Sequence, residues 1–344
     1  MPHRRHVAAV IAAFALLLPT AAAAAQDGPT RPRPRARVVG TLEESDVAHA
    51  MNRRGDVPFR TGQGGAGVWN AVTGERRALA DVPHALPTDI ADDGRVVGVR
   101  SGQGVVLWGA DGTVTTPGLP EGETSADTAR LGEDGTLLVA ASHQFISWPG
   151  GHPRVATSYY RWRPETGFQH LSGPNDGSYA SALNDKGIVV GWRDDTGTAW
   201  RPDGTEVRYS GSAPGTTRTW LHDINNAGVA VGGQIRPDGV SAAVRWGAPD
   251  APRQLADEGL GGQALDINAR GWITGTVRVT ADTVATSLPA VWDPHGAPHR
   301  LDSMLDLPEG TVRSIDDIND HNQLLLRVYD TAAGRMSTLV VQLR

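Results

Sequence analysis

One short pattern of apolar and polar positions recurs from residue 37 to the end of the chain. In most copies an apolar residue is followed by Asn or Asp, two polar or small residues, Gly, and a short apolar run. The seven copies lie at residues 51–55, 90–94, 131–135, 183–187, 224–228, 267–271 and 318–322. Asn322 takes the place of glycine in the last copy, and asparagine tolerates a positive φ better than most residues. Each copy therefore predicts the tight turn of a β-hairpin, with a strand on either side.

A tryptophan ends the next strand-like run in most units. These residues are Trp69, Trp108, Trp162, Trp200, Trp246 and Trp292, with Leu339 in this place in the seventh unit. A second turn follows the tryptophan, as at Asp203-Gly204, a pair typical of hairpins. Each unit is thus predicted to form four short strands, A to D, with tight A–B and C–D turns. No segment after residue 25 keeps the 3.6-residue apolar period of a helix, so we expect negligible helix content.

Four-stranded units of this length predict the blades of a β-propeller. The turn positions are 39 to 52 residues apart, and such units stack around an axis because none can bury its own faces. We predict an all-β, seven-bladed β-propeller over residues 37–344; a linear β-solenoid is the alternative. The last unit ends after its C strand, so residues 37–42 are expected to supply the missing D strand. This N-terminal strand would close the last blade and remove open sheet edges.

The repeat resembles that of a known family. Residues 182–191, ALNDKGIVVG, resemble the units of the HAF-type extracellular repeat proteins, which run apolar-Asn-Asp-x-Gly-x-Val-Val-Gly before a strand ending in tryptophan. The other six units share the pattern more loosely, and none keeps the His-Ala-Phe triplet. The resemblance implies a secreted, propeller-like module without a defined activity.

The N-terminus predicts export. Residues 3–6 are basic, residues 7–18 are apolar, and small residues stand at Ala23 and Ala25, which is typical of a signal peptide over residues 1–25. A transmembrane anchor is the alternative, but 12 to 18 apolar residues fall short of the roughly 20 needed to span a bilayer. We therefore expect a secreted, extracellular protein with no membrane span. Residues 31–35 alternate Arg and Pro, and residues 26–36 are predicted to form a disordered tether; an arm for nucleic acid or an anionic surface is the alternative.

Composition narrows the chemistry. The chain has no cysteine, which excludes disulfides, thiolate metal sites and a cysteine nucleophile. Its formal net charge of −6 argues against nucleic acid as a partner. Residues 62–67 fit G-x-G-x-x-G but precede a strand rather than a helix. No metal-ligand spacing is present. We expect neither a cofactor nor a metal.

Two sets of polar residues are candidates for chemistry. Adjacent carboxylates occur at residues 92–93, 194–195 and 316–317; such pairs can divide acid and base roles. Neighbouring strand residues point to opposite faces, however, so turn-building is the favoured interpretation. His49 and His222 occupy the same slot before the turn glycine, and their shared repeat position favours a structural role.

The loops opposite the tight turns are the predicted binding face, because binding residues concentrate on loops held by a rigid scaffold. The longest insertion, residues 143–160, carries Trp148, Tyr159 and Tyr160. A packed cluster beneath the loop is the alternative role for these aromatic residues. Three arginines that follow B strands are expected to point toward the same face: Arg60, Arg100 and Arg193.

These features predict a secreted, monomeric propeller that acts as an extracellular binding or interaction module. Its ligand would be a glycan, a peptide or a protein. The alternatives are an extracellular enzyme, a lyase or glycan hydrolase with its site at the channel mouth and no catalytic residue identifiable from sequence, and a purely structural envelope protein. Histidine, arginine and carboxylate side chains that converge in the channel would favour the enzyme. An exposed aromatic shelf would favour carbohydrate or peptide binding.

Overall fold

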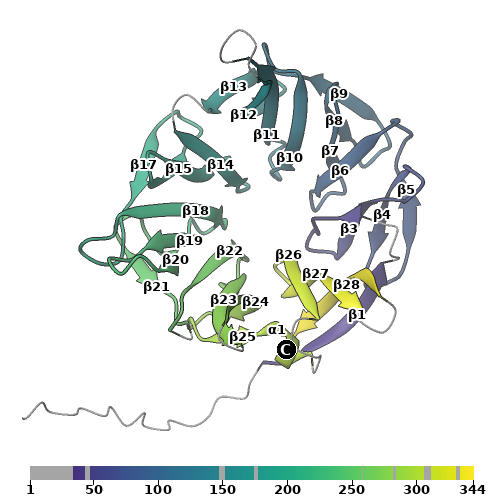
Figure 1. The fold of residues 1–344 in the computed structure, drawn as a ribbon. Helices are drawn as coiled ribbons and strands as arrows, with labels where there is room; N and C mark the ends of the chain where they lie inside the picture. Colours follow the sequence, from purple (N-terminus) through teal and green to yellow (C-terminus); the bar gives the residue numbers. More distant parts are fainter. Residues whose placement is uncertain are drawn as a thin grey trace, which may run out of the picture. The chain divides into compact units, whose positions relative to one another are not determined.

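Residues 34–344 form a ring of seven blades in the computed structural model (Figure 1). The structure describes residues 34–42, 47–146, 152–173, 177–257, 259–281, 284–305, 311–330 and 334–344. Each blade is a four-stranded antiparallel sheet, and the strands of blades 1 to 6 follow one another in sequence order. The predicted seven-bladed β-propeller is confirmed. The predicted signal peptide, residues 1–25, lies outside the described residues.

The first four blades hold sixteen of the strands. Blade 1 consists of β2 (Val47–Ala48), β3 (Asp56–Arg60), β4 (Ala66–Asn70) and β5 (Arg76–Ala78). Blade 2 consists of β6 (Ala85–Ile90), β7 (Val96–Arg100), β8 (Gly104–Trp108) and β9 (Val114–Gly118). Blade 3 consists of β10 (Ser125–Leu131), β11 (Leu137–Phe145), β12 (Arg154–Arg163) and β13 (Gly167–Ser172). Blade 4 consists of β14 (Ser178–Leu183), β15 (Val189–Arg193), β16 (Thr196–Trp200) and β17 (Glu206–Tyr209).

The remaining three blades complete the ring. Blade 5 consists of β18 (Arg218–Ile224), β19 (Ala230–Ile235), β20 (Ser241–Trp246) and β21 (Pro252–Gln254). Blade 6 consists of β22 (Gly262–Ile267), β23 (Ile273–Ala281), β24 (Val284–Trp292) and β25 (Pro298–Arg300), followed by the one-turn helix α1 (Leu301–Met304). Blade 7 consists of β26 (Val312–Ile318), β27 (Gln323–Asp330), β28 (Arg335–Leu343) and β1 (Ala36–Leu42).

The N-terminal strand closes the last blade, as predicted. Strand β1 pairs antiparallel with β28 through six residue pairs, from Ala36 with Leu343 to Leu42 with Thr338. The pairing begins earlier than expected: the backbones of Arg35 and Arg344 exchange hydrogen bonds of 3.1 and 2.8 Å. The last two residues assigned to the tether, Arg35 and Ala36, therefore belong to the closing ladder.

The A–B turns have the backbone that the repeat predicts. Gly55 has a φ of 80° and Asn322 a φ of 60°, so both occupy the left-handed region that glycine and asparagine tolerate. The asparagine that opens most turns caps them. The Oδ1 atom of Asn52, for example, accepts the backbone N–H groups of Arg54 and Asp56, each at 3.0 Å.

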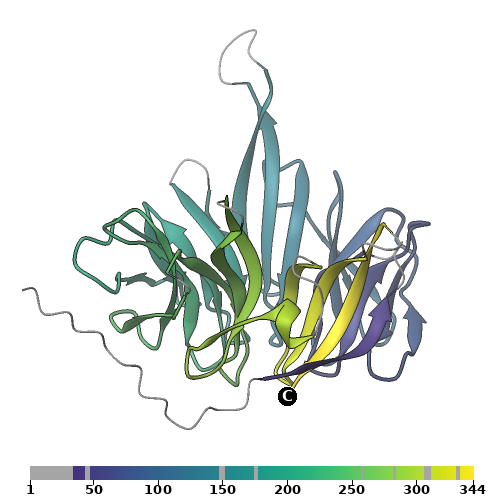
Figure 2. The same ribbon diagram turned by 60° about the horizontal axis from the view of Figure 1, so that its bottom comes forward.

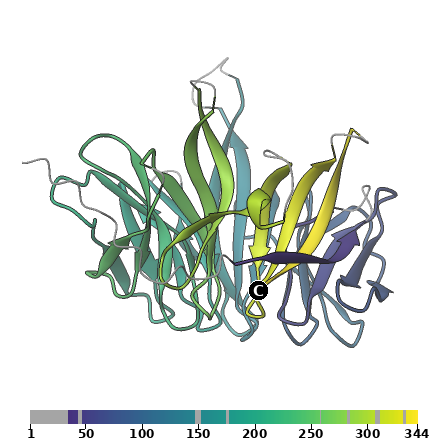
Figure 3. The same cartoon turned by 90° about the horizontal axis from the view of Figure 1, so that it is seen from below.

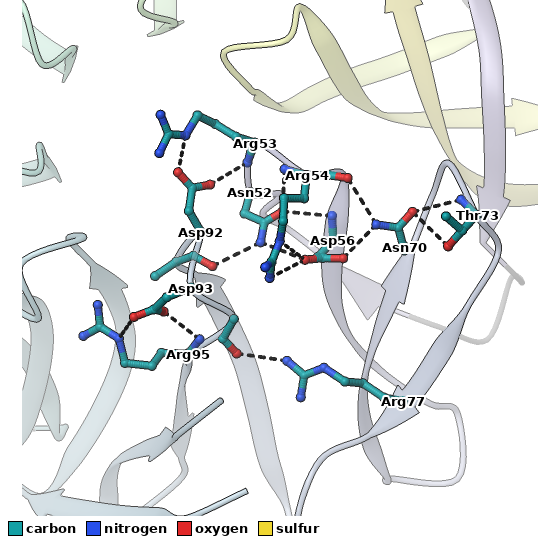
Figure 4. Close-up of polar contacts among 12 residues, drawn as sticks. Asn52, Arg53, Arg54, Asp56, Asn70, Thr73, Arg77, Asp92, Asp93 and Arg95 are labelled. Atoms are coloured by element: carbon teal, nitrogen blue, oxygen red, sulfur yellow. Dashed lines mark hydrogen bonds and ion pairs between the residues drawn. The ribbon is translucent and has the colours of Figure 1, made fainter. Parts of the chain in front are cut away.

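The same asparagines join neighbouring blades. Their Nδ2 groups donate to the carbonyl at the corresponding position of the next blade: Asn184 to Asn225, Asn225 to Asn268, Asn268 to Asn319, Asn319 to Asn52, and Asn52 to Ala91, at 2.9 to 3.1 Å. Figure 4 shows the junction of blades 1 and 2, where Asp92 also accepts the backbone N–H of Arg53 and pairs with its side chain. Because Ala91 and Gly132 replace asparagine in blades 2 and 3, this chain of amide bonds is broken there.

The repeated tryptophans fill the space between blades. Trp246 and Trp292 are fully buried, and the indole N–H of Trp292 donates to the carbonyl of Ala256 at 2.7 Å. The register corrects one position. In six blades the tryptophan pairs with the first apolar residue of the B strand, as Trp292 does with Ile273. In blade 7 the first apolar residue of the B strand is Leu324, and it pairs with Val341. Val341 therefore takes the place of the tryptophan, and the prediction of Leu339 is wrong.

Two blades extend beyond the others. The insertion expected as a loop over residues 143–160 is largely a continuation of the β11–β12 hairpin, in which nine residue pairs run from Leu137 with Trp162 to Phe145 with Arg154. Strands β23 and β24 also continue as a nine-pair hairpin. The sequences of both hairpins contain β-branched and aromatic residues, which favour extended strands. Figure 2 shows the β11–β12 hairpin above the ring, and Figure 3 shows both hairpins on the same face.

Candidate binding site

The innermost strand of each blade faces a central channel (Figure 1). These strands are β2, β6, β10, β14, β18, β22 and β26. Their side chains enclose a cavity of about 700 Å³, a size that accommodates a small organic ligand. The channel is therefore the candidate site.

The channel wall is mostly acidic at one level of the ring. The residue before the apolar turn residue occupies equivalent positions in all seven blades: Ala50, Asp89, Arg130, Ala182, Asp223, Asp266 and Asp317. Asp223, Asp266 and Asp317 come from three consecutive blades and are called the acid arc below. Blade 3, which carries Arg130, stands opposite blades 6 and 7 in the ring (Figure 1). One cation thus faces a group of carboxylates across the channel.

The acid arc is held in place by backbone N–H groups of the next blade. Asp223 accepts the N–H of Ile267 at 2.9 Å, Asp266 that of Ile318 at 3.2 Å, and Asp317 that of Met51 at 2.6 Å. These bonds fix the side chains without neutralising them, because each donor is an uncharged amide. The arc therefore serves both as a link between blades and as an acidic surface.

Crowding of the acid arc changes its protonation. Burial raises the pKa of Asp223 well above its ordinary value, and the neighbouring Asp266 raises it further. Burial, with repulsion from Asp317, raises the pKa of Asp266 to about 6. Burial, with repulsion from Asp89, raises the pKa of Asp317 to about 7. At neutral pH the arc is thus poised between its protonated and charged forms.

A β-bulge brings a second side chain of most inner strands to the channel. The register shifts between Ile315 and Asp317 in β26 and between Leu221 and Asp223 in β18. Asp316 and Asp317 therefore both line the cavity, although alternation along a regular strand would place them on opposite faces. The turn-building role predicted for this carboxylate pair is wrong. It holds at residues 92–93, where Asp93 caps the backbone N–H of Arg95 at 3.0 Å.

The two histidines that share a repeat slot both line the channel. His49 contacts Arg327 at 3.4 Å, and Arg327 pairs with Asp316 at 2.8 Å. Burial, partly offset by Asp316, lowers the pKa of His49. Burial lowers the pKa of His222 to about 4, and its Nε2 accepts the indole N–H of Trp220 at 3.0 Å. His222 is therefore neutral near pH 7.

Arg130 is the cationic counterpart of the arc. Burial alone would lower the pKa of an arginine, but the carboxylates of Asp89 and of the acid arc outweigh it and hold the pKa above the ordinary value. Among the described residues, its guanidinium makes no hydrogen bond and no ion pair within 4 Å. It faces the cavity with its donors open to a ligand.

A side cavity of about 320 Å³ adjoins the channel between blades 3 and 4. The two cavities share Asp127, Thr128, Arg130 and Ser181. Leu138, Ala140 and Ala180 form its apolar wall, together with two tyrosines. Tyr159 and Tyr179 meet edge-to-face at 4.8 Å, and Tyr179, which is 40 % exposed, stacks on Trp192 at 4.3 Å. This is an aromatic shelf beside the guanidinium of Arg130.

The predicted site residues fall in different places. Tyr159 lines the side cavity, whereas Tyr160 points to the other face of β12 and donates to Glu123 at 2.7 Å. Arg60, Arg100 and Arg193 end the B strands β3, β7 and β15, and none contributes to the lining of the channel or the side cavity. Arg193 pairs with Glu206. Trp148 lies outside the described residues.

Within the described ranges, no group of three or more His, Asp or Glu side chains is arranged to hold a metal ion. In the same residues, no helix has the length and apolarity required to cross a bilayer.

Comparison with known proteins supports the fold. No protein-family model and no curated protein sequence matches the chain. Among solved structures, virginiamycin B lyase from Staphylococcus aureus is similar at a TM-score of 0.54 and 11 % identity, over 90 % of this chain and 100 % of that one. An oligogalacturonate lyase in complex with manganese matches at a TM-score of 0.54 and 12 % identity, over 90 % and 96 % of the two chains.

A third match is confined to part of a larger protein. The acylaminoacyl peptidase of Pyrococcus horikoshii is similar at a TM-score of 0.56 and 11 % identity, over 89 % of this chain and 51 % of that one. At these identities the likeness establishes the propeller fold alone.

Proposed function

We propose that the protein is a binding module that takes a cationic group of a small ligand into its central channel. The observation that carries this proposal is the acid arc, in which Asp223, Asp266 and Asp317 face one cavity from consecutive blades. An ammonium or guanidinium group placed between them would relieve their mutual repulsion. The cavity of about 700 Å³ leaves room for the rest of such a ligand.

The protonation of the arc gives the proposal a distinctive pH dependence. Asp266 and Asp317 have pKa values of about 6 and about 7. Both are mostly protonated at pH 5 and charged at pH 8, so the affinity for a cation should rise across this range. A cation held by surface carboxylates would show no comparable rise, because those groups are already ionised at pH 5.

The test compares two molecules of equal length that differ in charge. Isothermal titration calorimetry with 1,4-diaminobutane and with 1,4-butanediol, at low salt and pH 8, should show binding of the diamine only. The double variant Asp266→Asn, Asp317→Asn should lose at least tenfold in affinity for the diamine. The single variant Asp203→Asn, in an exposed C–D turn, is the matched control and should bind like the wild type.

Circular dichroism and a thermal melt of each variant establish that it is folded. Equal binding of the diamine by the wild type and the folded double variant would overturn the proposal. So would binding that is as tight at pH 5 as at pH 8.

We further propose that the module is secreted and monomeric. Secretion rests on the basic and apolar segments of residues 1–25, and the monomeric state rests on the pairing of β1 with β28, which completes the last blade within one chain. Mass spectrometry of culture supernatant should find a chain that starts at Gln26, and light scattering should give the mass of one chain. An intact Met1 or a dimer mass would contradict these points.

An extracellular lyase or hydrolase is the second candidate. The observation in its favour is that carboxylates of different pKa, His49 and Arg130 all face one cavity, as acid–base chemistry requires. Lyases are among the similar folds. Incubation with pooled glycans and peptides, followed by mass spectrometry, should reveal new products that the folded Asp317→Asn variant does not form. Unchanged pools would remove this candidate.

A further inference from the structure

Among the described residues, the one arginine that lines the channel lies across it from the acid arc, while the carboxylates of Asp89, Asp127 and Asp185 line the channel on the side of Arg130. The acid arc lies on blades 5, 6 and 7, and Arg130 lies on blade 3, opposite blades 6 and 7 (Figure 1). From this geometry we infer that the channel ligand is a short peptide with free termini. Its ammonium group lies at the acid arc, its carboxylate at Arg130, and an apolar C-terminal side chain in the side cavity. This inference rests on the proposed function for its ammonium end only.

The carboxylate end follows from the state of Arg130. Its guanidinium lines both cavities and makes no hydrogen bond or ion pair within 4 Å among the described residues. A guanidinium presents a planar fork of donors that matches a carboxylate through two parallel bonds. Arginines elsewhere in the ring use such donors within the protein: Arg161 donates to the carbonyls of Gly187 and Trp200 at 3.1 and 2.9 Å. Asp89 is the carboxylate that acts most strongly on Arg130, but no ion pair within 4 Å joins them, so among the described residues the donors of Arg130 are left for a ligand.

The apolar side chain follows from the lining of the side cavity. Leu138, Ala140, Ala180 and the rings of Tyr159 and Tyr179 surround a space of about 320 Å³ next to Arg130. Burial of apolar ligand surface against these residues is favourable. The side cavity adjoins Arg130, so the side chain that enters it belongs to the residue whose carboxylate contacts Arg130. That residue is the C-terminal one of the peptide.

The separation of charges favours a peptide over a free amino acid. In an amino acid the ammonium and carboxylate are attached to one carbon. Here the two complementary groups belong to opposite walls of a cavity of about 700 Å³, and no ion pair within 4 Å joins Arg130 to Asp223, Asp266 or Asp317. A ligand that reaches both walls needs termini separated by several bonds.

The test removes each end of the ligand in turn. Calorimetry at pH 8 would use the tripeptide Gly-Gly-Phe, its C-terminal amide, its N-acetyl form, and Gly-Gly-Gly. Against the wild type, amidation should weaken binding by about tenfold to a hundredfold, the range for a charge-assisted hydrogen-bonded pair. Acetylation should also weaken it, and Gly-Gly-Gly and free phenylalanine should bind more weakly than Gly-Gly-Phe.

One variant tests whether Arg130 is the side chain that binds the peptide carboxylate. Arg130→Gln keeps a hydrogen-bonding side chain of similar reach without the charge, so it should bind Gly-Gly-Phe and its amide equally. Arg201→Gln, at an exposed C–D turn, is the matched control and should still discriminate between them. Circular dichroism and melts confirm that both variants fold.

The remaining outcomes separate the two proposals. If acetylation weakens binding and amidation does not, the carboxylate at Arg130 is wrong while the cation site stands. If 1,4-diaminobutane binds and no peptide does, the peptide inference alone is overturned. If neither the diamine nor the peptides bind, both proposals fail. Equal affinity for Gly-Gly-Gly and Gly-Gly-Phe would show that the side cavity does not bind the phenyl ring. Equal affinity for free phenylalanine and Gly-Gly-Phe would refute the inference that the ligand reaches from the acid arc to Arg130.

Discussion

Replacement of Asp317 by asparagine should change how the stability of the protein depends on pH. The folded-state pKa of Asp317 is about 7, raised from an ordinary value of 3.8. A carboxyl whose pKa is raised on folding stabilises the native state fully below pH 3.8, and this contribution is lost as the pH rises through about 7. Wild-type stability should therefore carry a falling component between about pH 4 and pH 8 that the Asp317→Asn variant lacks.

The magnitude follows from the size of the pKa difference. About three pH units, at about 1.4 kcal/mol per unit, give an upper figure of about 4 kcal/mol for Asp317. The substitution also has a constant cost of about 1 kcal/mol, because an amide can accept only one of the N–H bonds from Met51 and Ile318 that the carboxylate accepts. The variant should thus be less stable than the wild type at pH 4.5 and should gain on it by several kcal/mol at pH 8.5.

Comparison of the two proteins removes the titrations that they share, and the difference reports Asp317 together with its repulsion of Asp266. The lowered pKa values of His49 and His222 act in the opposite direction, since that stabilisation is lost as the pH falls below about 6.5. Both proteins share this effect, so it cancels. Urea unfolding at half-unit steps from pH 4.5 to 8.5 would give the difference curve, with Asp203→Asn as the control. Curves for the wild type and Asp317→Asn that stay parallel within about 0.5 kcal/mol would refute the assignment.

Three further predictions concern the ring itself. Trp292→Ala should cost about 3–5 kcal/mol of unfolding free energy, because the indole of Trp292 is fully buried. Val114→Ala, at a 40 % exposed site, should cost far less, and similar urea midpoints would contradict the packing role of the tryptophan. Deletion of residues 26–34 should leave the melting temperature nearly unchanged, and deletion of residues 26–42 should lower it strongly because it removes β1 from β28; equal melts would contradict closure. Asn268→Ala should cost about 1–3 kcal/mol by breaking the side-chain bonds to its own turn and to blade 7, and a change below about 0.5 kcal/mol would show that the asparagine chain is dispensable.

The architecture was predictable because it depends on local signals that repeat. A glycine or asparagine with positive φ ends each A–B turn, and the turn positions alone fix the number of blades. The incomplete seventh unit predicted the closing role of residues 37–42, which β1 confirms. Each of these inferences needs only the chain near the motif.

The candidate site was harder to predict because it depends on bulges. The register shift in β26 turns both Asp316 and Asp317 toward the channel, and no sequence signal marks the extra residue. In a regular strand the two side chains would lie on opposite faces of the sheet, so the sequence did not predict that both line the channel. The shared slot of His49 and His222 was visible in the sequence, and the corresponding bulge in β18 explains why that slot faces the channel.

The acid arc could have been found by aligning the repeats on their turns. Asp223, Asp266 and Asp317 each precede the apolar residue of the turn motif, as does Arg130. Equivalent positions on inner strands meet at one level of the channel, so this column of the repeat predicts a charged ring. The expectation that irregular loops carry the site directed attention to Tyr160 and Arg193, which contact their own blade or its neighbour instead.

A crystal structure of the protein grown with Gly-Gly-Phe at pH 8 would show whether the central channel binds a peptide and in which direction. Electron density is expected in the central channel, with the peptide carboxylate on Arg130, the phenyl ring in the side cavity against Tyr159 or Tyr179, and the ammonium group within hydrogen-bond distance of Asp266 or Asp317. Density for the peptide outside the channel, or a channel without peptide at a concentration that saturates binding in solution, would contradict the inference.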